Sequence, residues 1–258
     1  IEFAELPLGN ARNFLLGANG QGKSNLLEAL GLATALRSFR TQTLAALPRK
    51  GVKEYKLAYE LEHDTQGSTT LEIHSHTKGR SVWVDGEKVT RLVEFIGRFP
   101  SVTLCSSDLM LLRGSPSERR RFMDLTLSVV NRDYYTALRD FHRGIAERNR
   151  LLKSSGSTAE LSAFEAEIAP HASQIASYRE AGMRSLSEVL CRTYDRIAEA
   201  DEGPELSFRP NVDCHDTEAY CRLLHESRKR DQMIGATQRG PHRDDFNFSL
   251  QVGGAREY

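Results

Sequence analysis

Residues 17–24 of the chain form a glycine-rich segment that reads Gly-Ala-Asn-Gly-Gln-Gly-Lys-Ser. The segment matches the spacing G-x-x-x-x-G-K-[ST], which is typical of a tight loop that joins a strand to a helix. A short apolar run precedes it, and apolar residues at helical spacing follow it. This order predicts a buried strand over 13–16, then the loop, then a helix over 24–35.

Each residue type in this segment suits the binding of phosphate groups. Glycines let the backbone adopt positive φ and bring main-chain N–H groups close to a ligand, and the start of the following helix adds a partial positive charge. Lys23 offers a charge to the β- and γ-phosphates, and the Ser24 hydroxyl is a ligand for Mg²⁺. We therefore predict a site for ATP and Mg²⁺ made of Gly17, Ala18, Asn19, Gly20, Gln21, Gly22, Lys23, Ser24 and Asn25.

The composition indicates a folded chain without a global charge. It has 258 residues, 39% of them hydrophobic, and its 35 basic residues balance 35 acidic ones. With no net charge, binding to nucleic acid would require a local basic patch. No apolar run approaches the roughly 20 residues that span a bilayer, so we expect no membrane partner. Four cysteines without C-x-x-C spacing are expected to be reduced thiols in the cytoplasm.

The first and last regions of the chain have strand-like patterns. In residues 1–105, apolar and polar residues alternate over 55–61, which predicts a half-buried strand. Asp85-Gly86 after a short apolar run predicts a strand that enters a hairpin turn. Alternation returns in residues 236–258 and predicts a further strand.

The middle region, residues 106–235, has helical periodicity. Ser115 followed by Pro116 is a helix start signal. A long helix is predicted over 160–198, and we expect Pro170 to kink or divide it.

The order of strands, helices and strands predicts the domain organisation. We expect one α/β ATPase lobe, discontinuous in sequence, formed by residues 1–105 and 236–258. Residues 106–235 would form a helical lobe inserted into it.

Several segments, read together with the loop, resemble the RecF family of bacterial DNA-repair ATPases. They occur in the family's order and extend over nearly the whole chain. The matching blocks are GANGQGKSNLLE at 17–28, RSFR at 37–40, SDL at 107–109, LRGSPSERRRFMD at 112–124 and RGPHRDDF at 239–246.

The resemblance implies a P-loop ATPase head of the ABC type, similar to those of SMC and Rad50 proteins, with mixed sheets around the loop helix. Such heads form an ATP-dependent homodimer, with each ATP held between the loop of one subunit and the signature motif of the other. The family is implied to clamp duplex DNA and single-strand/duplex junctions. With RecO and RecR it is implied to assist RecA loading in DNA recombination, replication and the SOS response to DNA damage, with weak DNA-stimulated ATP hydrolysis.

Two family motifs do not occur among these residues. The signature Ser-x-Gly-Gln and the Walker B strand with its acidic end are not found in the chain. We therefore expect the C-terminal part of the ATPase lobe to be absent and leave the catalytic residues unknown. A chain without the Walker B carboxylates is expected to bind ATP but to hydrolyse it poorly.

Arginines provide candidate contacts to nucleotide or DNA. Arg37 and Arg40 follow the loop helix, where related heads place an arginine near nucleotide or DNA. Two further pairs lie on predicted helices, where positive charge at reachable spacing suits a DNA backbone and where solvated charges paired with neighbouring acids are the alternative. These candidate DNA contacts are Arg119, Arg120, Arg139 and Arg143.

Two other functions are compatible with the phosphate-binding loop. One is an ABC-type ATPase subunit coupled to another partner, such as a transporter. The other is a module that retains nucleotide without turnover. ATP-dependent retention of duplex DNA would distinguish the RecF-like function from both.

Overall fold

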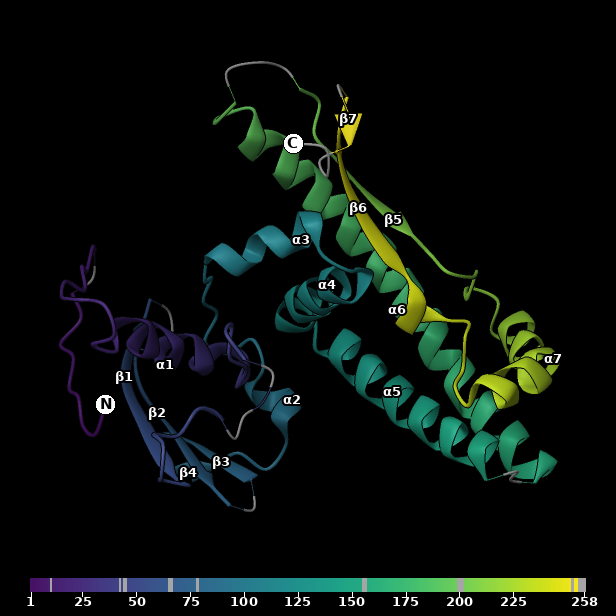
Figure 1. The fold of residues 1–258 in the computed structure, drawn as a ribbon, viewed down its shortest axis with the longest axis horizontal. Coiled ribbons are helices and arrows are strands. Elements are labelled where there is room, and N and C mark those ends of the chain that lie inside the picture. The colour runs from purple at the N-terminus through teal and green to yellow at the C-terminus, as the bar shows by residue number, and fades with distance from the viewer. Residues whose placement is uncertain are drawn as a thin grey trace. The chain divides into compact units, whose positions relative to one another are not determined.

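The structure is a computed structural model of residues 1–258, and it describes all of them except 10, 42, 44–45, 65–66, 78, 155–156, 199–201, 252 and 255–258. The chain divides into two compact units, Ile1–Leu104 and Cys105–Tyr258. Figure 1 shows both units.

The first unit packs one helix against an antiparallel sheet. The strands follow one another in the order β1-β2-β3-β4, so every connection is a hairpin. Its elements are α1 (Lys23–Ala35), β1 (Tyr55–His63), β2 (Gly67–His76), β3 (Gly79–Val84), β4 (Glu87–Lys88) and α2 (Leu92–Phe95).

Alternation along the strands builds the core of this unit. Leu71, Ile73, Val82 and Val84 point to one face of the sheet and are at most 5% exposed. They form one apolar cluster with buried residues of α1 and with Phe95. The predicted strand over 55–61 and the predicted hairpin are confirmed. Positive φ at Asp85 and Gly86 gives the tight turn that twisted hairpins favour.

The segment before the phosphate-binding loop differs from the prediction. Residues 13–16 do not form a strand, and the side chains of Phe14 and Leu16 are 79% and 91% exposed. A strand needs a neighbour that accepts its backbone hydrogen bonds, and within the described residues no strand pairs with this segment. The apolar run identified a segment suited to a sheet, but it could not show whether a partner lies beside it.

The second unit is mainly helical. Its long helices α5 and α6 pack against each other, and α7 packs against both. Its elements are η2 (Ser106–Leu109), α3 (Met110–Arg113), α4 (Pro116–Val130), α5 (Arg132–Lys153), α6 (Thr158–Tyr194), β5 (Glu205–Arg209), α7 (Thr217–Ile234), η3 (Pro241–Arg243), β6 (Asp245–Leu250) and β7 (Gly253–Gly254).

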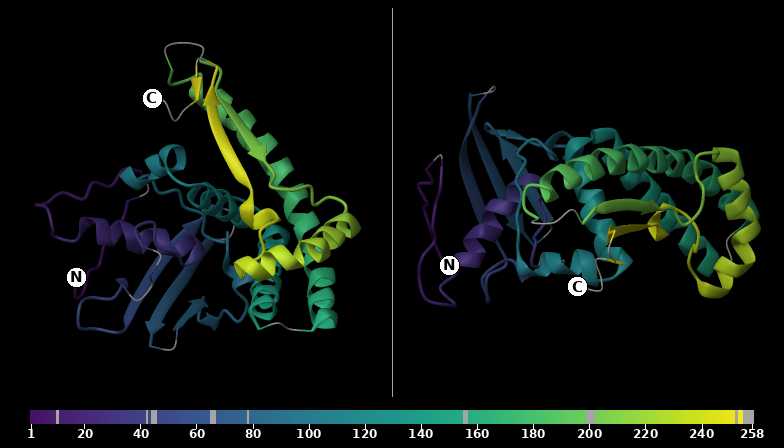
Figure 2. Two further views of the ribbon diagram at one scale, coloured as in Figure 1. Left: turned by 45° about the vertical axis from the view of Figure 1, so that its right-hand side comes forward. Right: turned by 90° about the horizontal axis from the view of Figure 1, so that it is seen from above.

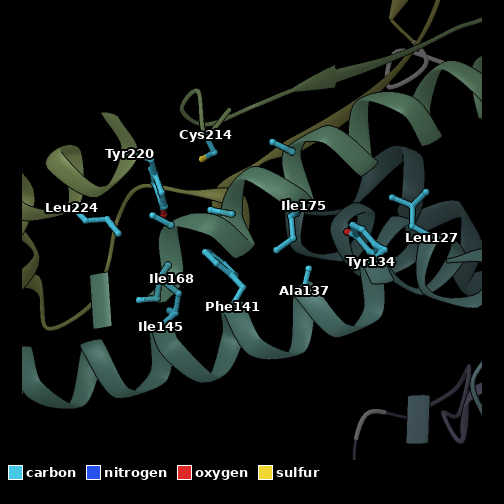
Figure 3. Packing of buried hydrophobic residues seen from close by; sticks show 13 residues of the cluster. Leu127, Tyr134, Ala137, Phe141, Ile145, Ile168, Ile175, Cys214, Tyr220 and Leu224 are labelled. Atoms are coloured by element: carbon cyan, nitrogen blue, oxygen red, sulfur yellow. The ribbon is translucent and has the colours of Figure 1, made fainter. Parts of the chain in front are cut away.

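The core of this unit lies between the facing sides of α5 and α6. Phe141 on α5 and Ile168 and Ile175 on α6 are fully buried, and Figure 3 shows these side chains pointing toward one another. Tyr220 and Leu224 of α7 extend the same cluster. The apolar stripe of each helix is thus matched by that of its neighbour, the arrangement that amphipathic helices favour.

Local capping fixes where the helices begin. Ser115 precedes α4 in a reciprocal bond pattern with Glu118, and Pro116 occupies the first helical position. The predicted start of this helix is therefore confirmed. Asn131 caps α5 by accepting bonds from two backbone N–H groups.

Two features of this unit differ from the predictions. The helix α6 runs without a break through Pro170, and on either side of this residue Ile168 and Ala172 pack in the same apolar cluster as residues of α5. The strand β5 lies within the region predicted to be helical. It pairs antiparallel with β6, from Glu205 opposite Ser249 to Arg209 opposite Asp245, and both strands run beside α6 in Figure 2. The predicted strand in the last region is confirmed as β6.

The strand β6 bears on the predicted division of the chain into two lobes. Contacts keep β6 with β5 and α4 in the second unit. A discontinuous lobe formed by 1–105 and 236–258 stays a prediction, and its last residues, 255–258, lie outside the described residues.

Membrane insertion by a helix is not indicated. Across the described residues, every helix is too short or too polar to cross a bilayer.

Candidate phosphate-binding site

The loop before α1 adopts the backbone conformation that its glycines predicted. Gly20 and Gly22 have φ of 81° and 92°, values that side-chain-bearing residues rarely adopt. A Cβ atom added at Gly17 or Gly20 would meet no protein atom within 4 Å. Packing therefore does not explain the absence of side chains there, and the open space beside the loop can accommodate an anion.

The first turn of α1 provides uncompensated donors next to the loop. The N-cap residue, Gly22, makes no side-chain cap, and the first turn contains no acidic residue. Asn25 N and Leu26 N bond to the Gly22 carbonyl, so the preceding amides of Lys23 and Ser24 belong to the group of helix-start N–H donors without an intrahelical acceptor. A phosphate is well suited to accept from such amides.

The ammonium of Lys23 lies over the loop. Its Nζ donates to the carbonyl of Gly17 at 2.6 Å and to that of Ala18 at 2.8 Å. An ammonium has three N–H donors, so one is left for a phosphate oxygen beside these carbonyls. The loop, the helix start and this charge converge, as binding of a triphosphate requires.

Ser24 and Asn25 complete the predicted site. Both are exposed on the first turn of α1, which leaves the Ser24 hydroxyl accessible to a metal ion held by bound phosphates. Within the described part of the chain, no three His, Cys, Asp or Glu side chains form a cluster able to hold a metal.

Arg40 reaches the edge of this site, whereas Arg37 is not seen to do so. The Nη1 of Arg40 donates to Asn25 Oδ1 at 2.7 Å and to Glu28 Oε2 at 3.2 Å. Its side chain is 47% exposed, so its other N–H donors remain accessible. Arg37 is exposed, and among the residues that the structure describes it makes no hydrogen bond to the loop.

Glu28 is a member of this site that the sequence analysis did not single out. It is 9% exposed and accepts hydrogen bonds from Ser38 Oγ and from Arg40. Ser38 Oγ in turn accepts from the amides of Arg40 and Thr41. Glu28 thus joins the helix after the loop to the segment that carries Arg40. The sequence held one signal for this role: Glu28 lies in the matching block at 17–28, and Arg40 lies in the matching block at 37–40.

The four helical arginines proposed to contact DNA have different environments. Arg119 is 2% exposed, and its Nε and Nη2 bond both carboxylate oxygens of Asp245 at 2.8 and 2.9 Å. It is therefore a buried structural residue, and its assignment as a DNA contact was wrong. The pattern of the sequence could not reveal this, because the acidic partner lies 126 positions away.

The other three remain at or near the surface. Arg139 bonds to the neighbouring Asp140 at 2.9 Å through both Nε and Nη2. Arg143 lies 3.6 Å from Asp140 and 3.7 Å from Glu167, so acidic residues neutralise this face of α5. Arg120 is half-buried and donates to a main-chain oxygen, that of Asp244, at 2.6 Å.

Comparison with known proteins places this geometry in context. No protein-family model matches the chain. The DNA replication and repair protein RecF of Moorella thermoacetica is 32% identical over 250 residues, which cover 95% of this chain and 66% of that protein. That of Streptococcus suis is 32% identical over 244 residues, 92% of this chain and 67% of that protein. That of Chlamydia trachomatis is 30% identical over 252 residues, 95% of this chain and 68% of that protein.

Two solved structures have the same fold. One is a structure of the recombination mediator protein RecF-ATP in the RecFOR pathway. It superimposes with a TM-score of 0.85 at 25% sequence identity, and the match covers 93% of this chain and 67% of that chain. The other, of RecF-ATPrS, gives 0.82 at 26% identity over 94% and 68%. The predicted fold class, a P-loop ABC-type ATPase head of mixed helices and sheets, is confirmed. The chain spans about two thirds of the length of these relatives.

Proposed function

Because the chain belongs to the RecF family of DNA replication and repair proteins, we propose that it acts as an ATP-dependent DNA-binding clamp in recombinational repair. The observation that carries this proposal is the loop at Gly17–Ser24 with Lys23 Nζ folded over it. The relatives' names and the solved RecF-ATP structure support the same class of ligand and process.

ATP would be held by the loop amides, the helix start and Lys23, and Mg²⁺ by the Ser24 hydroxyl. When bound, the metal would neutralise charge on the phosphates. Arg40, placed beside Asn25, would supply a further donor to the nucleotide. Arg37 remains a candidate contact to nucleotide or DNA.

The nucleotide would act chiefly as a switch. A ligand that bridges two heads stabilises the dimer by mass action, so ATP would favour a homodimer that encloses duplex DNA or a single-strand/duplex junction. RecO and RecR are the proposed partners, and RecA the protein whose loading is assisted. Hydrolysis would be slow, stimulated by DNA, and would end the clamped state.

The proposal is tested by retention of a labelled DNA duplex on the full-length protein with and without Mg-ATP. We expect retention that depends on ATP and is lost in the variant Lys23→Ala. The control is Lys53→Ala, which removes an exposed lysine of the same unit outside the loop. Equal retention with and without nucleotide would refute the switch, and ATP binding without any DNA retention would favour the alternative of an ATPase coupled to another partner.

A further inference from the structure

The segment from Gln238 to Asp245, which links α7 to β6, is held unusually firmly for a surface turn. It contains the matching block RGPHRDDF, to which the phosphate-binding site gives no role. Gly240 has φ of 134°, and a Cβ there would lie 2.1 Å from the Tyr220 hydroxyl oxygen. That hydroxyl donates to the Arg239 carbonyl at 3.1 Å. A side chain at position 240 would break this bond.

The carboxylates of the turn face inward. Asp244 is 2% exposed. Its Oδ2 accepts a hydrogen bond from Arg179 Nη1 at 2.7 Å, and its Oδ1 accepts one from the backbone N–H of Asn211 at 2.8 Å. Asp245 accepts from the buried Arg119. Arg179 also donates to the carbonyl of Pro241 at 2.7 Å. Buried arginines of α4 and α6 therefore neutralise the acids of the turn.

The remaining guanidinium groups of the turn face outward. Arg239 and Arg243 are exposed, and the nearest bond of Arg243 is a long one, 3.4 Å, to Gln238 Oε1. Arg120 reaches the same turn, because it donates to the carbonyl of Asp244, the residue after Arg243. Within the described residues, none of these three arginines makes an ion pair. A chain with zero net charge thus has a local excess of positive charge here.

We propose that Arg239 and Arg243, with Arg120 beside them, form a binding site for the phosphate backbone of nucleic acid. The inference rests on the proposed DNA binding and assigns it a surface. Arginine offers several N–H donors in a planar fork that fits phosphate oxygens. Burial and, after it, the charge of Arg179 lower the pKa of Arg120, although Asp124, Asp245 and Asp244 oppose this.

An acidic protein partner fits the patch less well. Protein interfaces have an apolar centre, whereas the exposed side chains of this turn are charged and its Pro241 is buried. The firm anchoring suits a phosphate site, because side chains on a rigid support lose less entropy when they bind.

The test measures the salt dependence of duplex DNA binding by the full-length protein in Mg-ATP, using fluorescence anisotropy between about 50 and 200 mM KCl. The variants are R239Q, R243Q and their combination. Each phosphate contact contributes about 0.9 to the slope of log affinity against log salt, or about a 3.5-fold loss of affinity over that range. We expect each single variant to reduce the slope by about 1 and the double variant by about 2.

The matched control is R222Q, which removes an exposed arginine of α7 that has its own acidic neighbour, Glu218, at 3.7 Å. Its slope should equal that of the wild type. Unchanged slopes in R239Q and R243Q, or an equal reduction of the slope in R222Q, would overturn the patch assignment and leave the proposed function standing. If R239Q and R243Q keep the wild-type slope but lose binding to a protein partner, the patch is a protein interface and the assignment to nucleic acid is wrong. A wild-type protein that binds no DNA would overturn the proposed function, and with it the patch.

Discussion

The phosphate-binding loop and the turn at Gly240 are both glycine-containing links beside a helix, yet they are held in opposite ways. The loop is exposed, and its shape comes from its own backbone and from Lys23 within it. The turn is held by side chains of residues far away in sequence, such as Arg179 and Tyr220. A local constraint produces a motif that can be recognised in sequence, whereas a distant one does not.

The same contrast predicts that substitutions at the two places affect different properties, namely ligand binding at the loop and the free energy of unfolding at the turn. Substitutions in the loop should change ligand affinity and leave the free energy of unfolding nearly unchanged. Substitutions in the anchors of the turn should destabilise the second unit. The following predictions test this separation.

The largest effect is expected for Arg179→Met. This arginine is 1% exposed and bonds Asp124 and Asp244, each at 2.7 Å. Removing it leaves carboxylates of a buried cluster without their counter-charge, which costs about 3–5 kcal/mol of unfolding free energy. Urea denaturation followed by helical circular dichroism measures it. The control Arg222→Gln should stay within about 0.5 kcal/mol, and a loss below about 1 kcal/mol for Arg179→Met would contradict the anchoring role.

The second prediction concerns the loss of stability at acidic pH, which we assign to His242. Burial, and then the charges of Arg243, His142 and Arg120, lower the pKa of His242 from 6.5 to about 4, although its bond to the Thr237 carbonyl opposes this. Between these values the unfolded chain binds a proton that the native chain does not. Stability is therefore complete above about pH 6.5 and falls as the pH decreases toward 4, by on the order of 2–3 kcal/mol.

The variant His242→Gln isolates this contribution, because glutamine can still donate to the Thr237 carbonyl and does not titrate in this range. Chemical denaturation at several pH values should show the wild type losing stability relative to the variant as the pH falls. Parallel curves for the two proteins would rule out His242 as the titrating group.

A smaller effect is expected for Glu28→Gln in the first unit. The change weakens the bonds to Ser38 and Arg40, and we expect about 1 kcal/mol of lost stability. If this carboxylate positions Arg40, the loss of ATP affinity in Glu28→Gln should not add to that in Arg40→Gln. A double-mutant cycle of nucleotide affinity measures the coupling, and fully additive losses would show that Glu28 acts only on the fold.

The smallest change in stability is expected for Lys23→Ala. Its ammonium bonds only exposed carbonyls, so the unfolding free energy should stay within about 0.5 kcal/mol of the wild type. Thermal unfolding without nucleotide measures it. Destabilisation as large as that of Glu28→Gln would mean that the loop, like the turn, depends on a side-chain anchor.

Much of the local structure was predictable from sequence. The helix α1, the hairpin at Asp85-Gly86 and the start of α4 at Ser115 all depend on neighbouring residues, and all were found as predicted. The phosphate-binding loop belongs to this group, because spacing within eight residues specifies it.

The features that escaped prediction depend on distant partners. The apolar run before the loop contains Phe14 and Leu16, but no strand pairs with it among the described residues. The strand β5 forms because β6, about 40 residues later, pairs with it. Arg119 reads as a surface residue of a charged helix until Asp245 is seen to bury it.

The central claim is that the loop at Gly17–Ser24 closes around the phosphates of ATP. Isothermal titration of the protein with Mg-ATP tests it most directly, with Lys23→Ala as the variant and Lys53→Ala as the control. We predict one ATP bound per chain, an affinity reduced about ten- to a hundredfold in Lys23→Ala through loss of a charged hydrogen bond, and no change in Lys53→Ala. Equal affinities in the wild type and in Lys23→Ala would contradict the account.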